Sequence, residues 1–182
     1  MKFKDIKYLI LSDVFRYGDK SRSLIFRNVF LGRNSSQRFT FWLRCCKSNN
    51  RFIRTFAKIQ RVRLTRKYGV QIPETCTIGS GLELPHCLPI VVHYNVKIGK
   101  NCTLYQFVTI GGDGRGKAPV IGDNCFIGSG AVIVGDIKIG NNVTVGANAV
   151  VTKDVPDNAT VGGVPAKILH YNHPGIFIKN PV

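Results

Sequence analysis

An aliphatic residue returns every six positions through most of the second half of this 182-residue chain. Glycine often follows it, and a small or aliphatic residue often stands fifth. The recurring positions are Ile72, Ile78, Leu84, Val92, Ile98, Leu104, Ile110, Ile121, Ile127, Ile133, Ile139, Val145 and Val151. Similarity at a short fixed period is typical of solenoids, and a period of six fits neither an α-helix nor a heptad repeat. We therefore expect an all-β core, a parallel β-helix built from hexapeptides.

Three hexads close one triangular turn of such a solenoid, and this fixes where each position points. The first residue of a hexad should face inward and stack on its equivalents in the turns above and below. The fifth should also face inward, near a crowded corner where small side chains fit: Cys76, Cys102, Cys125, Ala131, Val143 and Ala149. Glycine in second place would serve tight corners, through positive φ or through close approach of two backbones.

The six-residue count breaks in two places. Leu84 and Val92 are two residues too far apart for one hexad, and the excess contains His86. Ile110 and Ile121 are five residues too far apart, and the excess is rich in glycine. Because insertions in repeat proteins map to loops on the binding face, we expect the functional residues at these two breaks.

The net charge of +16 is carried almost entirely by the first third of the chain. Residues 1–68 hold 18 Lys and Arg against 3 Asp, whereas residues 69–182 hold 8 basic and 7 acidic residues. Apolar residues at spacings of three and four predict helices over 6–15, 23–31, 39–46 and 52–64. We divide the chain into a basic α-helical N-terminal domain at 1–68, a β-helix domain at 69–168 and a C-terminal tail at 169–182.

Three uses of the basic, aromatic-rich front remain open at this point. It can cover the open end of the β-helix and help subunits associate, since terminal repeats need covering. It can bind an anionic membrane surface through helices that are basic on one side and apolar on the other. Nucleic acid ranks last, because no fold motif for it accompanies the charge, and we expect no nucleic-acid partner.

Neither a leader peptide nor an apolar run of membrane-spanning length is expected in the sequence. The six cysteines include no Cys-x-x-Cys pair, so they are expected to act as small apolar residues in a reducing compartment. Only two histidines lie within the coils, which disfavours a three-histidine metal site, and no metal is expected. The expected location is cytoplasmic, with peripheral contact at the inner membrane face as the open alternative.

The repeat and its two breaks also carry a resemblance. The motifs run from Tyr68-Gly-Val-Gln-Ile-Pro through Leu84-Pro-His86 and Val108-Thr-Ile-Gly-Gly to the segment Val155–Lys167. Together they resemble the serine acetyltransferase family of hexapeptide acyltransferases over nearly all of residues 68–168. The resemblance implies a left-handed β-helix, a homotrimer or a hexamer of paired trimers, acetyl-CoA as co-substrate and a hydroxyl group as acceptor.

On this resemblance His86 is the catalytic general base. Moving an acetyl group from a thioester to a hydroxyl requires a base, and imidazole, with an ordinary pKa of about 6.5, suits that role near neutral pH. Gln71 stands where the family orients the imidazole. Pro85 and Lys117 stand at positions that bind the acceptor, and a looser likeness through Asp13–Asp19 makes Asp19 a further acceptor-binding candidate.

The resemblance also assigns a binding path for acetyl-CoA. Gly111 and Gly112 can bring backbone N–H groups close to the thioester and its developing oxyanion. Ser129 and Ala147 match positions lining the groove for the pantetheine arm, and Lys153 and Lys167 match lysines near the phosphates. Such a groove lies between subunits, so a monomer is expected to be inactive.

The chain also departs from the family at acceptor-binding positions. Gln71 and Pro85 stand where the family has aspartates, and Lys117-Ala118 stands where it has an Arg-His pair. With these charges missing, we expect an acetyl-CoA-dependent O-acetyltransferase acting on a sugar hydroxyl of a surface polysaccharide or its precursor. Two alternatives stay open: serine O-acetyltransferase of cysteine biosynthesis, and a non-catalytic trimeric scaffold.

Overall fold

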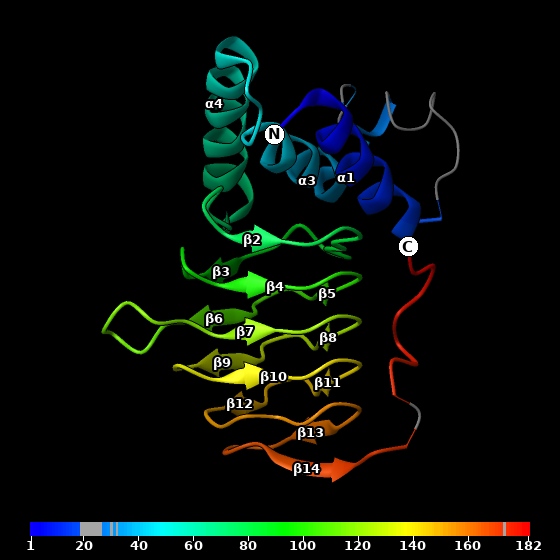
Figure 1. Cartoon of the computed structure of the whole chain (residues 1–182), viewed down its shortest axis with the longest axis vertical. Helices are drawn as coiled ribbons and strands as arrows, with labels where there is room; N and C mark the ends of the chain where they lie inside the picture. The colour runs from blue at the N-terminus through cyan, green and yellow to red at the C-terminus, as the bar shows by residue number, and fades with distance from the viewer. Residues whose placement is uncertain (19–26, 30, 32, 173) are drawn as a thin grey trace.

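The computed structural model describes residues 1–18, 27–29, 31, 33–172 and 174–182. Three helices, α1 (Phe3–Arg16), α3 (Ser35–Cys45) and α4 (Arg51–Tyr68), lie at one end of a tall stack of short strands (Figure 1). Among the described residues no helix is long and apolar enough to cross a bilayer. The helix expected over 23–31 lies largely outside the described residues.

The strands form three sheets, one for each face of a triangular coil. The first sheet holds β1 (Val70–Gln71), β3 (Ile90–Val92), β6 (Thr109–Gly111), β9 (Val132–Val134) and β12 (Val150–Val151). The second holds β2 (Thr77–Ile78), β4 (Lys97–Ile98), β7 (Val120–Ile121) and β10 (Lys138–Ile139). The third holds β5 (Thr103–Leu104), β8 (Phe126–Ile127), β11 (Thr144–Val145), β13 (Thr160–Gly162) and β14 (Lys167–His170).

Neighbouring strands are parallel throughout, except that β14 pairs antiparallel with β13 at the far end of the stack. The predicted β-helix with helices at its front is therefore confirmed. All thirteen residues that open a hexad face the interior, the most exposed being Ile78 at 8%. Each buried aliphatic side chain of this size contributes about 1.5–3 kcal/mol, so the ladders are the main source of stability.

Glycine in second place serves only one of its two expected purposes. A Cβ on Gly79 would lie 2.7 Å from the backbone of Gly99, and one on Gly122 would lie 2.7 Å from the carbonyl oxygen of Gly140. These glycines therefore let successive coils stack closely. Positive φ falls instead on the fourth residue of the hexad, which is usually asparagine, a residue that tolerates this conformation.

Those asparagines form a ladder down one corner of the solenoid. The side-chain amide of Asn101 donates to Asn124 at 3.0 Å, Asn124 donates to Asn142 at 3.0 Å, and Asn142 donates to Asn158 at 2.9 Å. The C-terminal tail returns along this side of the stack to the helices (Figure 1), where the backbone N–H of Val182 donates to Asn101. The sequence analysis did not identify this ladder.

The first coil has no coil above it, and side chains of the helices bind its open backbone edge. Arg44 donates to the carbonyl oxygens of Ile78 at 2.7 Å and Gly79 at 2.6 Å. Ser12 and Asp13 accept hydrogen bonds from the N–H groups of Gly81 and Leu82. The same pattern continues along the edge with Lys47 bonded to Cys76, Arg16 to Gly81 and Thr65 to Val70.

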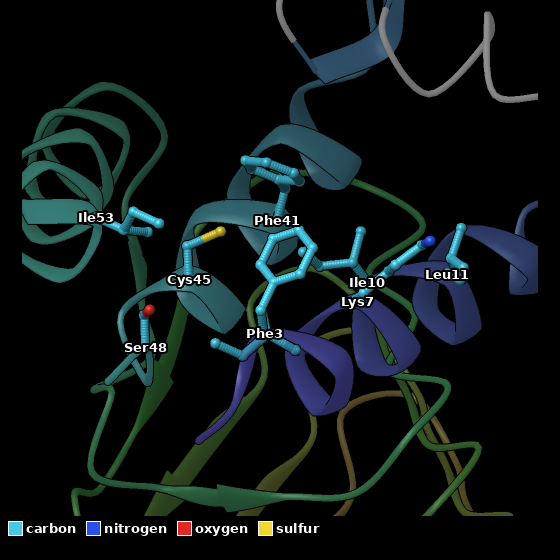
Figure 2. A pocket seen from close by; sticks show the side chains of 9 residues that line it. Phe3, Lys7, Ile10, Leu11, Phe41, Cys45, Ser48 and Ile53 are labelled. Atoms are coloured by element: carbon cyan, nitrogen blue, oxygen red, sulfur yellow. The ribbon is translucent and has the colours of Figure 1, made fainter. Parts of the chain in front are cut away.

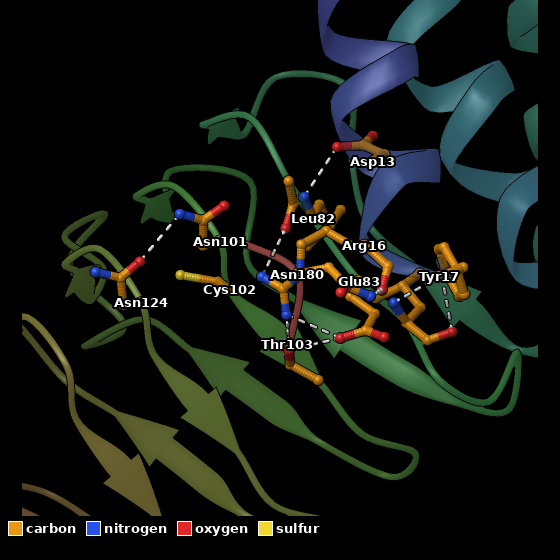
Figure 3. A network of polar contacts seen from close by, with 12 residues as sticks. Asp13, Arg16, Tyr17, Leu82, Glu83, Asn101, Cys102, Thr103, Asn124 and Asn180 are labelled. Atoms are coloured by element: carbon orange, nitrogen blue, oxygen red, sulfur yellow. Dashed lines mark hydrogen bonds and ion pairs between the residues drawn. The ribbon is translucent and has the colours of Figure 1, made fainter. Parts of the chain in front are cut away.

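Two of the ion pairs in this junction between helices and coil are largely buried. Arg44 and Asp13 are joined at 2.8 Å, and each side chain is only 2% exposed. Arg16 pairs with Glu83 at 2.9 Å and also donates to the hydroxyl of Thr103 at 2.8 Å (Figure 3). Because both arginines also bind backbone carbonyls, their charges are compensated by several groups at once.

We expect Arg44→Ala to lower the free energy of unfolding by about 3–5 kcal/mol, because it leaves a buried carboxylate and two edge carbonyls without their partner. Denaturant unfolding followed by circular dichroism measures this. The control is Arg63→Ala, an exposed arginine on α4 that should change stability by less than about 0.5 kcal/mol. Equal effects of the two substitutions would contradict the role given to the junction.

Candidate functional site

His86 is exposed on the segment that leads from the third sheet to the first sheet. Its ring lies edge-on to Tyr105, with ring centroids 5.9 Å apart. Leu84 before it and Cys87 after it are both buried. The imidazole therefore projects from a segment anchored on each side in the core.

Tyr17, just after α1, fixes the backbone of this segment. Its hydroxyl accepts a hydrogen bond from the N–H of Leu84 at 2.9 Å and donates one to the carbonyl oxygen of the same residue at 3.1 Å. Burial raises the pKa of Tyr17 well above its ordinary value, so the hydroxyl keeps the proton it donates. Glu83, the preceding residue, is held by Arg16 (Figure 3). The helices thus position the backbone two residues before His86.

Cys87 is not suited to act as a nucleophile in this structure. Burial raises the pKa of its thiol to about 11, and the hydrogen bond with Ser35 lowers it only in part. The thiol is therefore protonated near neutral pH, whereas the thiolate is the nucleophilic form. Its place in the core identifies Cys87 as a packing residue.

His86 stands at the top of a column of residues at one corner of the solenoid. Strand pairing aligns Glu83 with Thr103, Leu104 with Ile127, Ile127 with Val145 and Val145 with Val161. The residues two places after each inward aliphatic then fall in one column: His86, Gln106, Ser129, Ala147 and Gly163. We call this set the histidine corner. Successive members are one coil apart, about 4.8 Å.

The histidine corner carries one unsatisfied polar atom and adjoins a groove. The side-chain oxygen Oε1 of Gln106 is buried and has no hydrogen-bond partner among the described residues. Lower down, a groove of about 480 Å³ lies between the third sheet and the tail, lined by Phe126, Thr144, Ala147, Thr160 and Phe177 among others. A chain of rings links it to the histidine, since Tyr105 lies 5.1 Å from Phe126 and Phe126 lies 4.9 Å from Phe177.

Gly111 and Gly112 lie at a different corner, at the end of β6 and the base of the long insertion. A Cβ on Gly112 would lie 2.6 Å from the carbonyl oxygen of Lys117 and 3.2 Å from the ring nitrogen Nε2 of His93. Lys153 follows β12 in the same column, two coils further on. We call this set the glycine corner. Because the first sheet lies between the two corners, a single chain does not bring them together.

The long insertion, which projects from the stack between β6 and β7 (Figure 1), is held by polar contacts within it and with the neighbouring coils. Asp113 accepts hydrogen bonds from the N–H groups of Arg115 and Lys117, and Asn95 donates to the carbonyl oxygen of Gly116. The exposed Lys117 ammonium pairs with Asp136 at 2.5 Å, and that hydrogen bond raises the pKa of the lysine. The insertion therefore projects as an ordered loop with Arg115 and Lys117 at its exposed edge.

The remaining predicted site residues are spread over the surface. Gln71 is exposed in β1 beside Val91, and no hydrogen bond joins it to His86 among the described residues. Pro85 is half-buried next to His86. Lys167 is exposed where β14 pairs with Gly162, at the foot of the histidine corner. Asp19 lies outside the described residues.

Three residues of the site were missed in the sequence analysis: Tyr17, Tyr105 and Gln106. The signal for Gln106 was available, because it holds the same hexad position as Ser129 and Ala147. Tyr17 and Tyr105 had no such signal, since a packed or exposed tyrosine would give the same pattern.

Comparison with known proteins shows which families have similar sequences and structures. The family model described as "Bacterial transferase hexapeptide (six repeats)" matches residues 118–153. A serine acetyltransferase of Bacillus pumilus is 39% identical over 107 residues, which cover 57% of this chain and 49% of the relative. The chain thus spans about half the length of the curated relatives it matches.

Solved structures extend the match through the helices. A serine acetyltransferase from Brucella abortus superposes with a TM-score of 0.75 at 28% identity, covering 91% of this chain and 69% of that one. The chain is a serine acetyltransferase-like hexapeptide-repeat protein. The enzyme from Neisseria gonorrhoeae, solved in complex with serine, gives a TM-score of 0.73 at 29% identity and covers 92% and 70% of the two chains. The left-handed form expected for the β-helix agrees with these serine acetyltransferase structures.

These findings correct the expected acceptor. A sugar hydroxyl of a polysaccharide precursor was expected because Gln71, Pro85 and Lys117-Ala118 lack the family's charges. That expectation is wrong: the curated relatives and structural neighbours are serine acetyltransferases, and one neighbour contains serine. Missing charges at a few aligned positions were weaker evidence than the similarity of the serine acetyltransferase-like chain as a whole.

We expect Gly112→Ala to loosen the long insertion of this serine acetyltransferase-like chain, because the added methyl group would collide with the carbonyl of Lys117. Gly111→Ala is the matched control, since its Cβ would lie 3.6 Å from Val134, an ordinary contact distance. Limited trypsin digestion measures the difference through cleavage after Arg115 and Lys117, which should be faster only in Gly112→Ala. Equal cleavage rates would show that the close approach at Gly112 does not hold the loop.

Proposed function

We propose that this chain is an acetyl-CoA-dependent O-acetyltransferase whose acceptor is the hydroxyl group of serine. The observation that carries the proposal is the histidine corner, where an exposed imidazole stands above a column of small residues on a serine acetyltransferase-like fold. A structural neighbour was solved in complex with CoA, at a TM-score of 0.71 and 26% identity. Another was solved with serine. Acetyl-CoA supplies the activated acetyl group.

His86 acts as the general base in this proposal. Its imidazole removes the hydroxyl proton of serine as the oxygen bonds to the thioester carbonyl carbon. When the carbon–sulfur bond breaks, the imidazolium returns the proton to the departing thiolate. The products are O-acetylserine and free CoA thiol, and no covalent enzyme intermediate is required. The two hydrogen bonds between Tyr17 and the backbone of Leu84 restrict the position of His86. Such positioning of a catalytic group is a large part of catalytic efficiency.

The histidine corner fits the pantetheine arm of acetyl-CoA. Small side chains at Ser129, Ala147 and Gly163 leave room for an extended chain below His86. The buried, unpartnered Oε1 of Gln106 can accept a hydrogen bond from an amide N–H of the arm. Lys167 lies at the foot of the column, about five strand steps of 4.8 Å from His86, where it can meet phosphate. Lys153 on the glycine corner would approach from a neighbouring subunit.

We propose a homotrimer as the assembly, because it accounts for this arrangement. The base and the small-residue column lie at one corner, and Gly111, Gly112 and Lys117 lie at another. Three chains related by a threefold axis can place the glycine corner of one against the histidine corner of the next, so that each site uses two chains. A monomer would retain both half-sites and have no activity.

The uncharged Gln71 and Pro85 affect how tightly serine is held. The family places carboxylates at both positions, and here neither is available to meet the ammonium group of the substrate. The exposed Arg115 remains to meet its carboxylate, whereas Lys117 is paired with Asp136. We therefore expect serine to bind weakly through its ammonium end, while the hydroxyl is still activated by His86.

We expect purified protein to release CoA thiol from acetyl-CoA when L-serine is supplied, and His86→Asn to lower kcat by about 10²–10⁴-fold. Thiol release is followed with a chromogenic disulfide, and acetyl-CoA affinity and melting temperature serve as controls for folding and binding. Release with serine no faster than background hydrolysis would refute the proposed function. A normal trimer that releases no thiol with serine would favour the scaffold alternative, and normal turnover in His86→Asn would remove the assignment of the base.

We expect Pro85→Asp to lower the KM for serine by about tenfold or more, because a charge-assisted hydrogen bond to the ammonium group is worth about 1.5–3 kcal/mol. Steady-state kinetics at saturating acetyl-CoA measure it, with Pro85→Asn as the control of similar size without charge. A KM unchanged by Asp, or lowered equally by Asn, would show that the ammonium group does not lie beside this position.

A further inference from the structure

One side of α4 carries large apolar side chains that are about half exposed or more, although the Phe56 ring also packs edge-on against Trp42. Phe52 is 86% exposed, Phe56 is 52% exposed and Ile59 is 47% exposed. They follow one another at spacings of four and three, so they form a stripe along one side of the helix. Only Ala57 and Leu64 of this helix are buried. An exposed cluster of this kind on a monomer marks an interaction surface.

The same side of α4 is basic. Arg51, Arg63 and Arg66 are exposed, and none has a carboxylate within ion-pair distance among the described residues. The helix has no acidic residue of its own. Two other cations of the helix, Lys58 and Arg61, are ion-paired, and they share the single carboxylate of Glu74. The stripe with these three arginines is called the α4 face below.

An apolar cavity of about 290 Å³ lies between α1, α3 and the start of α4, where Ile53, the neighbour of Phe52, lines it (Figure 2). Figure 2 shows Phe3 and Ile10 of α1, Phe41 and Cys45 of α3 and Ile53 of α4 around it. Lys7 also lines it and Phe3 is 73% exposed. The cavity enlarges the apolar area at this end of the molecule and adds another cation to it.

The charge of the α4 face decides between possible partners. A second copy of the chain would bring two sets of unpaired arginines together, and like charges facing each other in an interface cost binding energy. Nucleic acid would use the arginines, yet the aliphatic Ile53 and Ile59 and the apolar cavity offer nothing to phosphates. A lipid bilayer with anionic headgroups matches both parts, because cations meet the headgroups while aromatic and aliphatic groups enter the interface.

We propose that the α4 face docks on the surface of an anionic lipid bilayer, with Phe52 and Phe56 entering the interface and Arg51, Arg63 and Arg66 binding headgroups. The helix lies on the membrane and does not span it. This surface is separate from the histidine and glycine corners, so the proposal is independent of the proposed acetyl transfer.

Co-sedimentation of the full chain with vesicles tests the proposal. Binding is expected with vesicles of mixed phosphatidylglycerol and phosphatidylcholine, should weaken as salt is raised, and should be absent with phosphatidylcholine alone. Replacing Arg51, Arg63 and Arg66 together by Gln should lower the affinity about hundredfold, which is about fivefold for each basic residue. Phe52→Ser, alone and combined with Phe56→Ser, should also weaken binding. The melting temperature should be kept in the single variant, because Phe52 is exposed whereas the Phe56 ring also packs on Trp42.

The matched control replaces Lys97, Lys100 and Lys138 by Gln, which removes the same charge from exposed positions on the coils. It should bind vesicles like the wild type. Equal losses in the two triple variants would mean that only net charge matters, and this would overturn the proposed face. Absence of vesicle binding would overturn it as well. In that case, binding to a single-stranded RNA would assign the face to nucleic acid, and a sedimentation coefficient lowered by the phenylalanine variants would assign it to a second copy.

Discussion

A parallel solenoid cannot satisfy the backbone of its own first coil, and this constraint shapes the N-terminal third of the chain. Each coil passes its hydrogen bonds to the next, so the first coil leaves a row of N–H and C=O groups facing outward. Left bare under packed helices, each would cost about 1–3 kcal/mol. The helices meet that row with side chains chosen by what each group lacks: Arg44 and Lys47 donate to carbonyls, while Asp13 and Ser12 accept from N–H groups.

This requirement accounts for part of the basic composition. A carbonyl needs a donor, and arginine offers five N–H groups on a planar fork without needing any bond in return. Arg44 uses this property fully, since one guanidinium binds two carbonyls and the carboxylate of Asp13. The charge of the front is therefore of two kinds. Arginines such as Arg44 and Arg16 are buried structural donors, whereas Arg51, Arg63 and Arg66 remain exposed and are available to a partner.

The period of six predicted the fold well because it reports a single repeated burial environment. Every residue from Ile72 to Val151 that opens a hexad is inside, and the small fifth residues are too. The acceptor was not predictable in the same way. Gln71, Pro85 and Lys117 were interpreted by comparison with charged residues at the same positions, but the sequence does not say which other groups meet a substrate once chains assemble. The network around Arg16 and Tyr17 could not be predicted either. The six-residue period carries no information on how the helices dock on the open edge of the first coil.

The same stacking that buries the ladders also fixes the distances between equivalent positions on the surface of successive coils. Residues at one hexad position recur at a fixed rise, so the number of coils sets how far Lys167 lies from His86. The two insertions leave the strand pairing in register, because both lie at corners and the extra residues loop outward without entering a strand. An insertion at a corner can therefore vary freely in sequence, whereas one inside a strand would turn inward residues outward through every later coil. The proposed catalytic residue His86 therefore lies at a corner, where a loop can change without disturbing the strands. The helices fix the position of Leu84, two residues before it, through Tyr17.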